Sequence, residues 1–179
     1  MSDLKIVLTG PESTGKSTLA LQLAEHFQGG VITEFARPYI AGLNRSYEYK
    51  DLELIAKRQI YELENFEFNS KNKIVFLDTF LIITKVWFEV VYKTCPEWII
   101  NEIGKSQVDL YLLCVPDLPW EKDEVRENGG EMREWLFKEY ERNLIMFNFD
   151  YKKVDGLGSS RLDCAVKHVE TLMSLKGVN

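Results

Sequence analysis

A short glycine-bounded stretch near the start of the chain limits the possible folds more than any other feature of the sequence. It comprises Gly10, Pro11, Glu12, Ser13, Thr14, Gly15, Lys16 and Ser17. An apolar run, residues 4–8, precedes it, and an amphipathic segment, residues 18–27, follows it. A buried strand, a glycine-bounded loop and a helix in this order are typical of a P-loop, where main-chain N–H groups at a helix N-terminus surround a phosphate. The glycines permit a close approach that a side chain would prevent. The stretch therefore predicts a site for nucleotide phosphates.

The same loop supplies groups for ATP and Mg²⁺. Lys16 is expected to reach the β- and γ-phosphates, and the Ser17 hydroxyl is a hard oxygen ligand for Mg²⁺. Thr18, the next residue, completes the loop residues predicted to bind ATP. A second metal ligand is expected at Asp78, where the apolar run within residues 73–79 ends as a Walker B strand does. Such runs are common, but the P-loop upstream favours a Mg²⁺ ligand, direct or through water.

A carboxylate and a guanidinium, Glu34 and Arg37, follow a short apolar run, residues 31–33. Ligands of open parallel sheets bind outside the carboxyl ends of the strands, so both groups are expected to face the same cleft as the P-loop. A surface ion pair at a helix start is the alternative. Either Glu34 or Asp78 could accept the proton of an acceptor hydroxyl. A carboxylate bound to Mg²⁺ is a poorer base, which favours Glu34.

Several aromatic residues are candidates for substrate contacts. Tyr61 lies on a long predicted helix that starts at an N-cap, Asp51, and runs to about residue 68. Trp87 lies on a predicted crossover helix, residues 80–93. For both aromatic residues, a place in the core or at its rim is the alternative to stacking on a substrate.

A charged segment, residues 117–133, resembles the lid of a phosphotransferase. It begins near Trp120, a further candidate for substrate binding, and contains two arginines, Arg126 and Arg133, and a Gly-Gly pair. Either arginine could neutralise charge on the transferring phosphoryl group. The alternative is a solvated loop.

Strand-like and helical segments alternate along the whole chain. The remaining predicted strands, residues 109–115 and 151–155, are followed by helical patterns at 131–149 and 161–175. A turn at residues 156–161 ends in Arg161, which is expected to help bind the adenine of ATP. This order predicts one α/β domain, residues 1–179. We expect a three-layer P-loop fold with a five-stranded, essentially parallel sheet and a helical lid.

Composition excludes several other classes of protein. The net charge of −6 argues against binding to duplex nucleic acid. The three cysteines, Cys95, Cys114 and Cys164, lack the spacing of metal ligands, and disulfides are not implied. No apolar run approaches the roughly 20 residues of a membrane span. The first strand begins by Leu4, which leaves no room for a signal peptide, so a cytoplasmic protein is expected.

Three functional classes share a P-loop. A GTPase would need an Asn-Lys-x-Asp run to read guanine, and the sequence contains none. A motor or AAA-type ATPase normally needs a larger domain and partner subunits. A small-molecule kinase needs a P-loop, a metal carboxylate, a base and a lid, and the chain has a candidate for each. The sequence therefore favours a kinase.

The order of these motifs resembles the ribosylnicotinamide kinase domain of the NadR family. The resemblance rests on the P-loop, Glu34-Phe35-Ala36-Arg37, Leu77-Asp78-Thr79, and the Pro116–Trp120 stretch that leads to Arg126. It implies that ATP phosphorylates the 5′-hydroxyl of N-ribosylnicotinamide to give nicotinamide mononucleotide, a step of NAD biosynthesis.

Two positions, Thr33 and Phe80, differ from many members of that family and lie where the acceptor should bind. A kinase for another nucleoside or a small alcohol is therefore an alternative. So is an ATP-binding regulatory or sensor protein that hydrolyses ATP slowly.

Overall fold

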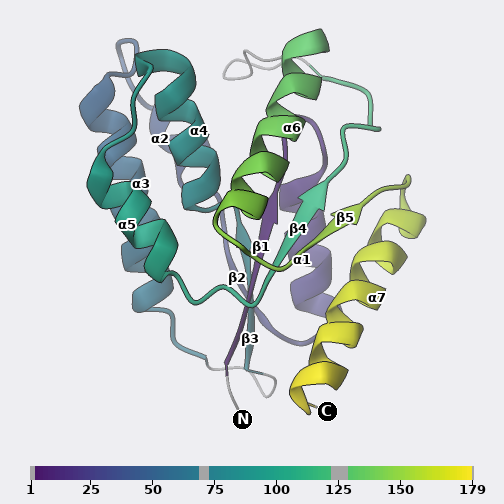
Figure 1. Cartoon of the computed structure of the whole chain (residues 1–179). Coiled ribbons are helices and arrows are strands. Elements are labelled where there is room, and N and C mark those ends of the chain that lie inside the picture. Colours follow the sequence, from purple (N-terminus) through teal and green to yellow (C-terminus); the bar gives the residue numbers. More distant parts are fainter. Residues whose placement is uncertain (1–2, 69–72, 122–128, 179) are drawn as a thin grey trace.

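The computed structural model of the chain describes residues 3–68, 73–121 and 129–178 (Figure 1). Strands and helices alternate through most of this length. In chain order they are β1 (Leu4–Thr9), α1 (Lys16–His26), β2 (Gly30–Ile32), α2 (Ala36–Ala41), α3 (Tyr49–Glu64), β3 (Ile74–Asp78), α4 (Leu81–Tyr92), α5 (Glu97–Lys105), β4 (Leu110–Cys114), α6 (Gly130–Met146), β5 (Tyr151–Val154) and α7 (Ser159–Lys176).

All five strands form one parallel sheet in the order β2-β3-β1-β4-β5. The predicted five-stranded parallel sheet is confirmed. The first strand lies at its centre, between β3 and β4, and Leu8 pairs with Asp78 across the β1–β3 ladder. The loop after β1 and the acidic end of β3 therefore lie side by side at the carboxyl edge of the sheet.

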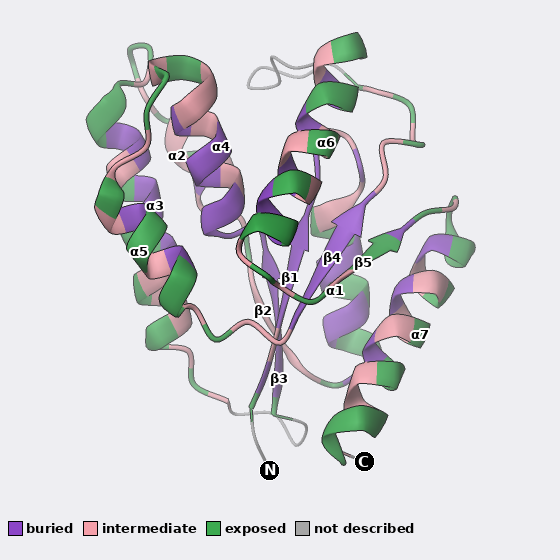
Figure 2. Ribbon diagram, viewed as in Figure 1, coloured by how far each residue is buried: buried purple, intermediate pink, exposed green. Residues whose placement is uncertain are grey.

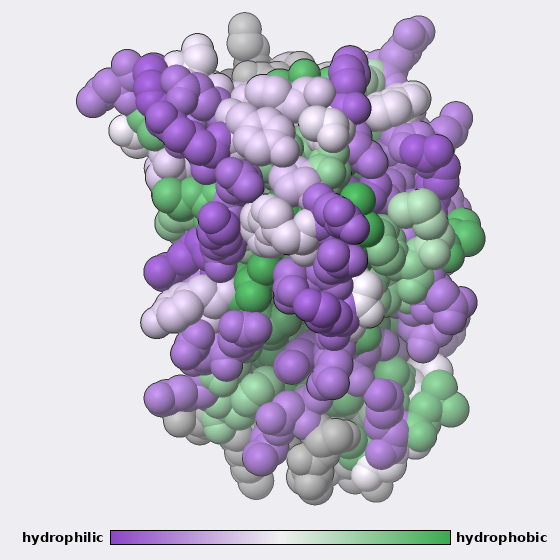
Figure 3. Space-filling view, turned by 60° about the vertical axis from the view of Figure 1, so that its left-hand side comes forward, coloured by the Kyte–Doolittle hydropathy of each residue, from purple (hydrophilic) through white to green (hydrophobic). Residues whose placement is uncertain are grey.

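Helices cover both faces of the sheet, which explains why its central strands are almost entirely buried and mainly apolar (Figure 2). Along β1, Ile6 and Leu8 pack with residues of α1 and α7, while Val7 packs on the other face with residues of α3, α4, α5 and α6. This alternation gives two apolar cores and the three layers that were predicted. The face of the molecule in Figure 3 shows many hydrophilic residues with apolar patches between them.

The observed start of α3 corrects one prediction. Asp51 is not the N-cap. Glu48 occupies that position, and Asp51 lies three residues after it, at position N3 of the helix. The Asp51 carboxylate accepts a hydrogen bond from the Glu48 main-chain N–H at 2.6 Å, and the Glu48 side chain accepts one from the main chain of Asp51, as in a reciprocal capping box. The helix also ends at Glu64, earlier than residue 68.

The predicted lid is described only in part. Its first residues, Asp117–Glu121, form no helix, and α6 begins at Gly130. Arg126 lies outside the described residues. Among the residues that are described, no helix is both long and apolar enough to cross a membrane.

Candidate active site

The P-loop turns sharply between β1 and α1. Gly10 has φ of +141°, and a side-chain Cβ placed there would lie 2.7 Å from the Cys114 carbonyl oxygen of the adjacent β4. Gly15 and Ser13 also have positive φ, +74° and +55°. Inside the turn, the Thr14 hydroxyl donates to the Pro11 carbonyl at 2.9 Å. A glycine is therefore required at position 10 by both backbone conformation and lack of space.

Three ionisable side chains meet beside this loop: Lys16, Glu34 and Asp78. Burial lowers the pKa of Lys16, and the charges of Glu34 and Asp78 oppose that shift. Burial raises the pKa of Glu34, Lys16 opposes the rise, and Asp78 adds to it. The Lys16 ammonium donates to the Pro11 carbonyl at 2.7 Å. This arrangement gathers a cation and two carboxylates at the end of the phosphate loop.

The residues expected to bind Mg²⁺ fit that ion. Asp78 is buried, and its Oδ1 atom has no hydrogen-bond partner among the described residues. Ser17, the second residue of α1, is exposed to solvent. No group of three or more His, Cys, Asp or Glu side chains in the described part of the chain could hold a metal alone. A carboxylate, a hydroxyl, phosphate oxygens and water form the kind of partial protein site that Mg²⁺ normally occupies.

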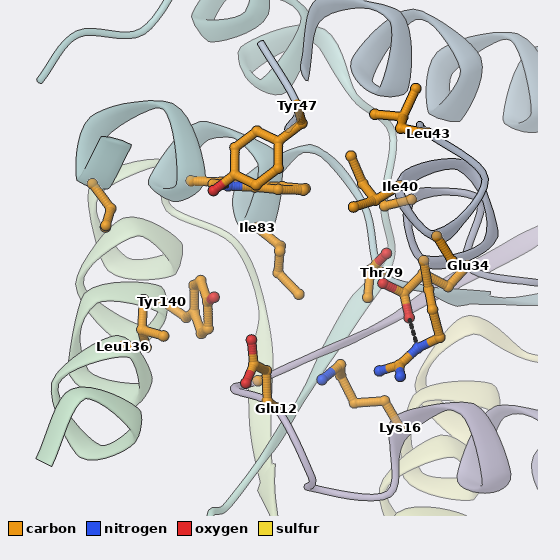
Figure 4. Close-up of a pocket in the computed structure, with 16 residues that line it drawn as sticks. Glu12, Lys16, Glu34, Ile40, Leu43, Tyr47, Thr79, Ile83, Leu136 and Tyr140 are labelled. Atoms are coloured by element: carbon orange, nitrogen blue, oxygen red, sulfur yellow. Dashed lines mark hydrogen bonds and ion pairs between the residues drawn. The ribbon is translucent and has the colours of Figure 1, made fainter. Parts of the chain in front are cut away.

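A cavity of about 380 Å³ opens directly from the P-loop (Figure 4). This volume lies within the usual range for small-molecule sites. Lys16, Glu12 and Glu34 line one end of it, and Tyr47 lies further away. Trp87 lines the cavity beside Tyr47. Its lining residues are Gly10, Glu12, Lys16, Glu34, Ala36, Arg37, Ile40, Ala41, Leu43, Tyr47, Thr79, Ile83, Trp87, Val90, Leu136 and Tyr140.

The aromatic wall is built by two segments that are 40 residues apart in sequence. The Trp87 indole N–H donates to the Tyr47 hydroxyl at 3.2 Å, and the two rings meet edge to face with their centres 5.0 Å apart. A planar ring of a substrate could pack against such a wall. Trp87 was predicted as a substrate contact, and the structure places it in the cavity.

The loop that carries Tyr47 is held by a buried carboxylate, Asp51. Arg45 donates to both Asp51 oxygens, at 2.6 and 2.9 Å, and the Tyr39 hydroxyl donates at 2.8 Å. The Arg45 guanidinium is the main cause of an Asp51 pKa far below the ordinary carboxyl value. This network connects α2, the loop and the start of α3.

Arg133 contacts main chain of the P-loop and of the lid segment. Its guanidinium donates to the carbonyls of Glu12 at 2.9 Å, Ser13 at 2.8 Å and Leu118 at 2.8 Å. The side chain is buried. In this structure Arg133 therefore holds the phosphate loop to the segment after β4, and this positioning role was not expected from the sequence.

Other predicted residues occupy different places. Arg37 lines the cavity and pairs with Glu34 at 3.6 Å. Tyr61 lies outside the described residues that line the cavity; it is 55% exposed, and Arg58 lies over its ring. Trp120 also lies outside that set and packs close to Gly129.

Arg161 is buried near the start of α7. It pairs with Asp117 at 2.7 Å and donates to the carbonyls of Gly156 and Val115 at 2.8 and 2.7 Å. It therefore joins the loop after β4 to the turn after β5. Adenine contact by Arg161 stays a prediction.

Sequence reasoning missed several residues of the cavity. Neither Tyr47, in a polar connection without a periodic pattern, nor Tyr140, on α6, was among the predicted substrate contacts. Glu12 was predicted among the loop residues that bind ATP, but its side chain points into the cavity. Position in the P-loop predicts the backbone conformation of Glu12 but gives no signal for the direction of its carboxylate.

The chain is similar in sequence to curated proteins. The chain is 27% identical over 151 residues to the trifunctional NAD biosynthesis/regulator protein NadR of Escherichia coli strain K12, which covers 79% of this chain and 37% of that protein. It thus spans little more than a third of the length of that curated relative.

Solved structures share the fold. A crystal structure of NadR in complex with NR superimposes with a TM-score of 0.79 at 24% identity, covering 96% of this chain and 52% of the other. NadR in complex with NAD and AMP-PNP gives 0.73 at 24% identity, covering 96% and 50%. A deoxyadenosine kinase from M. mycoides, with products dCMP and dCDP, gives 0.64 at 17% identity, covering 94% and 100%.

The resemblance to NadR that the motifs suggested is therefore confirmed, and the fold is that of P-loop kinases. The sequence profile described as "AAA domain" matches residues 5–161. The chain belongs to this AAA domain family of P-loop proteins.

Proposed function

We propose that the chain is an ATP-dependent kinase that phosphorylates the 5′-hydroxyl of N-ribosylnicotinamide to give nicotinamide mononucleotide. One observation carries the proposal: a cavity with an aromatic wall opens directly onto the P-loop at Lys16, next to Glu34. A protein that only hydrolyses ATP has no need of a second small-molecule cavity at that point. The NadR structure in complex with NR and the one with AMP-PNP support the choice of acceptor and of ATP.

The phosphate donor lies on the P-loop in this mechanism. Main-chain N–H groups and Lys16 bind the β- and γ-phosphates, and they neutralise the charge that spreads over the γ-phosphoryl oxygens in the transition state. Ser17 and Asp78 would hold Mg²⁺, which would supply further neutralisation of the phosphate charge. Arg126 remains a candidate for a lid arginine at the γ-phosphate, whereas Arg133 acts through the loop.

The acceptor lies in the cavity with its ring against Trp87 and Tyr47 and its 5′-hydroxyl toward Lys16. The hydroxyl oxygen attacks the γ-phosphorus, the bond from this phosphorus to the β–γ bridging oxygen breaks, and ADP leaves. Glu34 accepts the hydroxyl proton. A pKa raised by burial makes this carboxylate a stronger base than an exposed glutamate. Arg37, paired with Glu34, fixes its orientation.

A second acceptor class has its own support. The likeness to the deoxyadenosine kinase extends over the whole length of that enzyme, so another nucleoside could occupy the same cavity. The family name, AAA domain, is also compatible with a sensor that hydrolyses ATP without an acceptor.

Labelled ATP, Mg²⁺ and a panel of nucleosides separate these functions. The panel contains N-ribosylnicotinamide, adenosine, 2′-deoxyadenosine and cytidine. We expect the label to appear in nicotinamide mononucleotide, with little inorganic phosphate. If the label appears only in another nucleotide, the acceptor is a different nucleoside. Release of inorganic phosphate alone would contradict the kinase proposal.

A further inference from the structure

Glu12 places a carboxylate inside the phosphate-binding loop. A carboxylate among groups that bind phosphate repels the same phosphates, and this repulsion is large where water is excluded. The direction of this side chain therefore matters both for ATP and for a ligand in the neighbouring cavity. In this structure Glu12 lines the cavity of the acceptor.

The backbone on both sides of this carboxylate is held in place. Arg133, itself buried, donates to the carbonyl oxygens of Glu12 and Ser13 at 2.9 and 2.8 Å. The Ser13 hydroxyl accepts a hydrogen bond from the Glu121 main-chain N–H at 3.1 Å. These contacts fix the peptide groups beside Glu12, so its side chain leaves the loop in a defined direction.

The Glu12 side chain points into the space between the Lys16 end of the cavity and its aromatic wall. Figure 4 shows the Glu12 carboxylate pointing toward the same space as the Lys16 ammonium and the Tyr140 ring, while Tyr47 lies at the far end. The pKa of Tyr140 is raised, mainly by burial and further by the charges of Glu12 and Glu34, which places these groups near one another. An acceptor with its ring at Tyr47 and its 5′-hydroxyl at Lys16 presents its sugar to Glu12.

We propose that Glu12 is a specificity-determining residue that accepts hydrogen bonds from the sugar hydroxyls of the acceptor that are not phosphorylated. An ionised carboxylate has two oxygens that only accept, so it can bind a neighbouring pair of hydroxyls. This inference rests on the proposed function, and it assigns a second task to the loop: its main chain binds the donor and one of its side chains selects the acceptor.

The test compares Glu12→Gln with the wild type on three acceptors: N-ribosylnicotinamide and its 2′-deoxy and 3′-deoxy forms. A hydrogen bond to a charged group corresponds to about a 10- to 100-fold change in affinity or rate. We expect the wild type to lose about this much in kcat/KM when a contacted hydroxyl is removed. In Glu12→Gln the loss should shrink to about threefold or less, while the KM for ATP is unchanged or lower.

Glu131→Gln is the matched control. It makes the same substitution at an exposed residue of α6 that does not line the cavity. Full discrimination between the three acceptors in Glu12→Gln would overturn the inference. So would weaker ATP binding with unchanged discrimination, which is the result of a purely structural role in the loop.

Calorimetric binding of the same three compounds without ATP provides a readout that does not depend on turnover. If the wild type phosphorylates none of them, the proposed function fails. The difference in hydroxyl preference between wild type and Glu12→Gln in calorimetry then still decides the role of Glu12. Equal preference overturns it, and a lost preference in the variant supports it.

Discussion

The proposed donor side and the proposed acceptor side of this site are built by different means. On the donor side, one continuous loop of eight residues surrounds the proposed phosphate position. The conformation of its main chain forms most of this site. On the acceptor side, side chains from α2, the loop before α3, α4 and α6 meet around a cavity. The first kind of site is specified by local sequence, and the second by the packing of helices far apart in the chain. The comparison predicts that donor-side changes affect catalysis strongly and acceptor-side changes affect selectivity.

The largest effect is expected for Lys16→Ala. It removes the only side-chain cation that the described part of the P-loop contributes to the cavity, beside Glu34 and Asp78. We expect turnover to fall by about 10³-fold or more, since a positioned cation at a transferring phosphoryl group contributes about 10³–10⁵ in rate in related chemistry. Steady-state phosphotransfer measures the effect, with Lys138→Ala on α6 as control. Retained activity in a folded Lys16→Ala protein would remove the P-loop from the mechanism.

Glu34→Gln should have the next largest effect, a fall of about 10²- to 10⁴-fold in turnover. Glu34 must be deprotonated to accept a proton, and burial raises its pKa above the ordinary 4.5. The wild-type rate should therefore rise with pH through a range above 4.5. Burial lowers the pKa of Lys16, so the loss of rate at alkaline pH should begin below its ordinary 10.5. A variant within about tenfold of wild type, with the same acid limb in its pH profile, would exclude Glu34 as the base.

Arg133→Lys tests whether the donor side depends on the fixed loop. A lysine cannot donate to three carbonyls in the geometry of a guanidinium. We expect affinity for AMP-PNP to fall about tenfold, the usual size of a lost hydrogen bond to a charged group. Isothermal titration measures it, and Arg142→Lys, an exposed pair with Glu139, is the control. If AMP-PNP binding is unchanged while turnover collapses, Arg133 contacts the transferring phosphoryl group directly.

The smallest effect belongs to the acceptor side. Asp51→Asn weakens the network that holds the loop of Tyr47, so this loop should be correctly placed for a smaller fraction of time. If the loop is correctly placed in about one-tenth of the molecules, the KM for the acceptor rises about tenfold. The KM for ATP stays the same. A change in both KM values by the same factor would show that the two sides are not independent.

The same variant has a distinct dependence on pH. The pKa of Asp51 is lowered in the folded protein, so its ionised form stabilises the fold above the ordinary pKa of 3.8. This stabilisation is lost as the pH falls below that value. The difference in Tm between wild type and Asp51→Asn should therefore shrink from pH 7 toward pH 3. A constant difference would mean that the Asp51 charge does not contribute.

The two sides also differ in how well the sequence predicted them. The P-loop, the five parallel strands and the place of Asp78 at a strand end followed from local patterns. Glu34 and Arg37 were predicted in the same cleft because the carboxyl ends of parallel strands share one edge. Tyr47, in contrast, lies in an irregular connection whose conformation depends on Asp51.

The same limit explains the errors. Asp51 is a typical N-cap residue, but it functions three positions later, where its carboxylate also binds Arg45 and Tyr39. Tyr61 has the right chemistry for stacking, but its face of α3 is turned to solvent. Local patterns indicate which residues lie on a helix, whereas the packing of that helix decides what each of them contacts.

The central claim is that one loop presents ATP to an alcohol bound in the adjoining cavity. A crystal structure with AMP-PNP, Mg²⁺ and N-ribosylnicotinamide tests it most directly. We predict triphosphate on residues 10–17, the acceptor ring against Trp87 and Tyr47, and the 5′-hydroxyl between Glu34 and the γ-phosphorus. A nucleotide base of AMP-PNP in the aromatic cavity, or an acceptor bound elsewhere, would contradict the account.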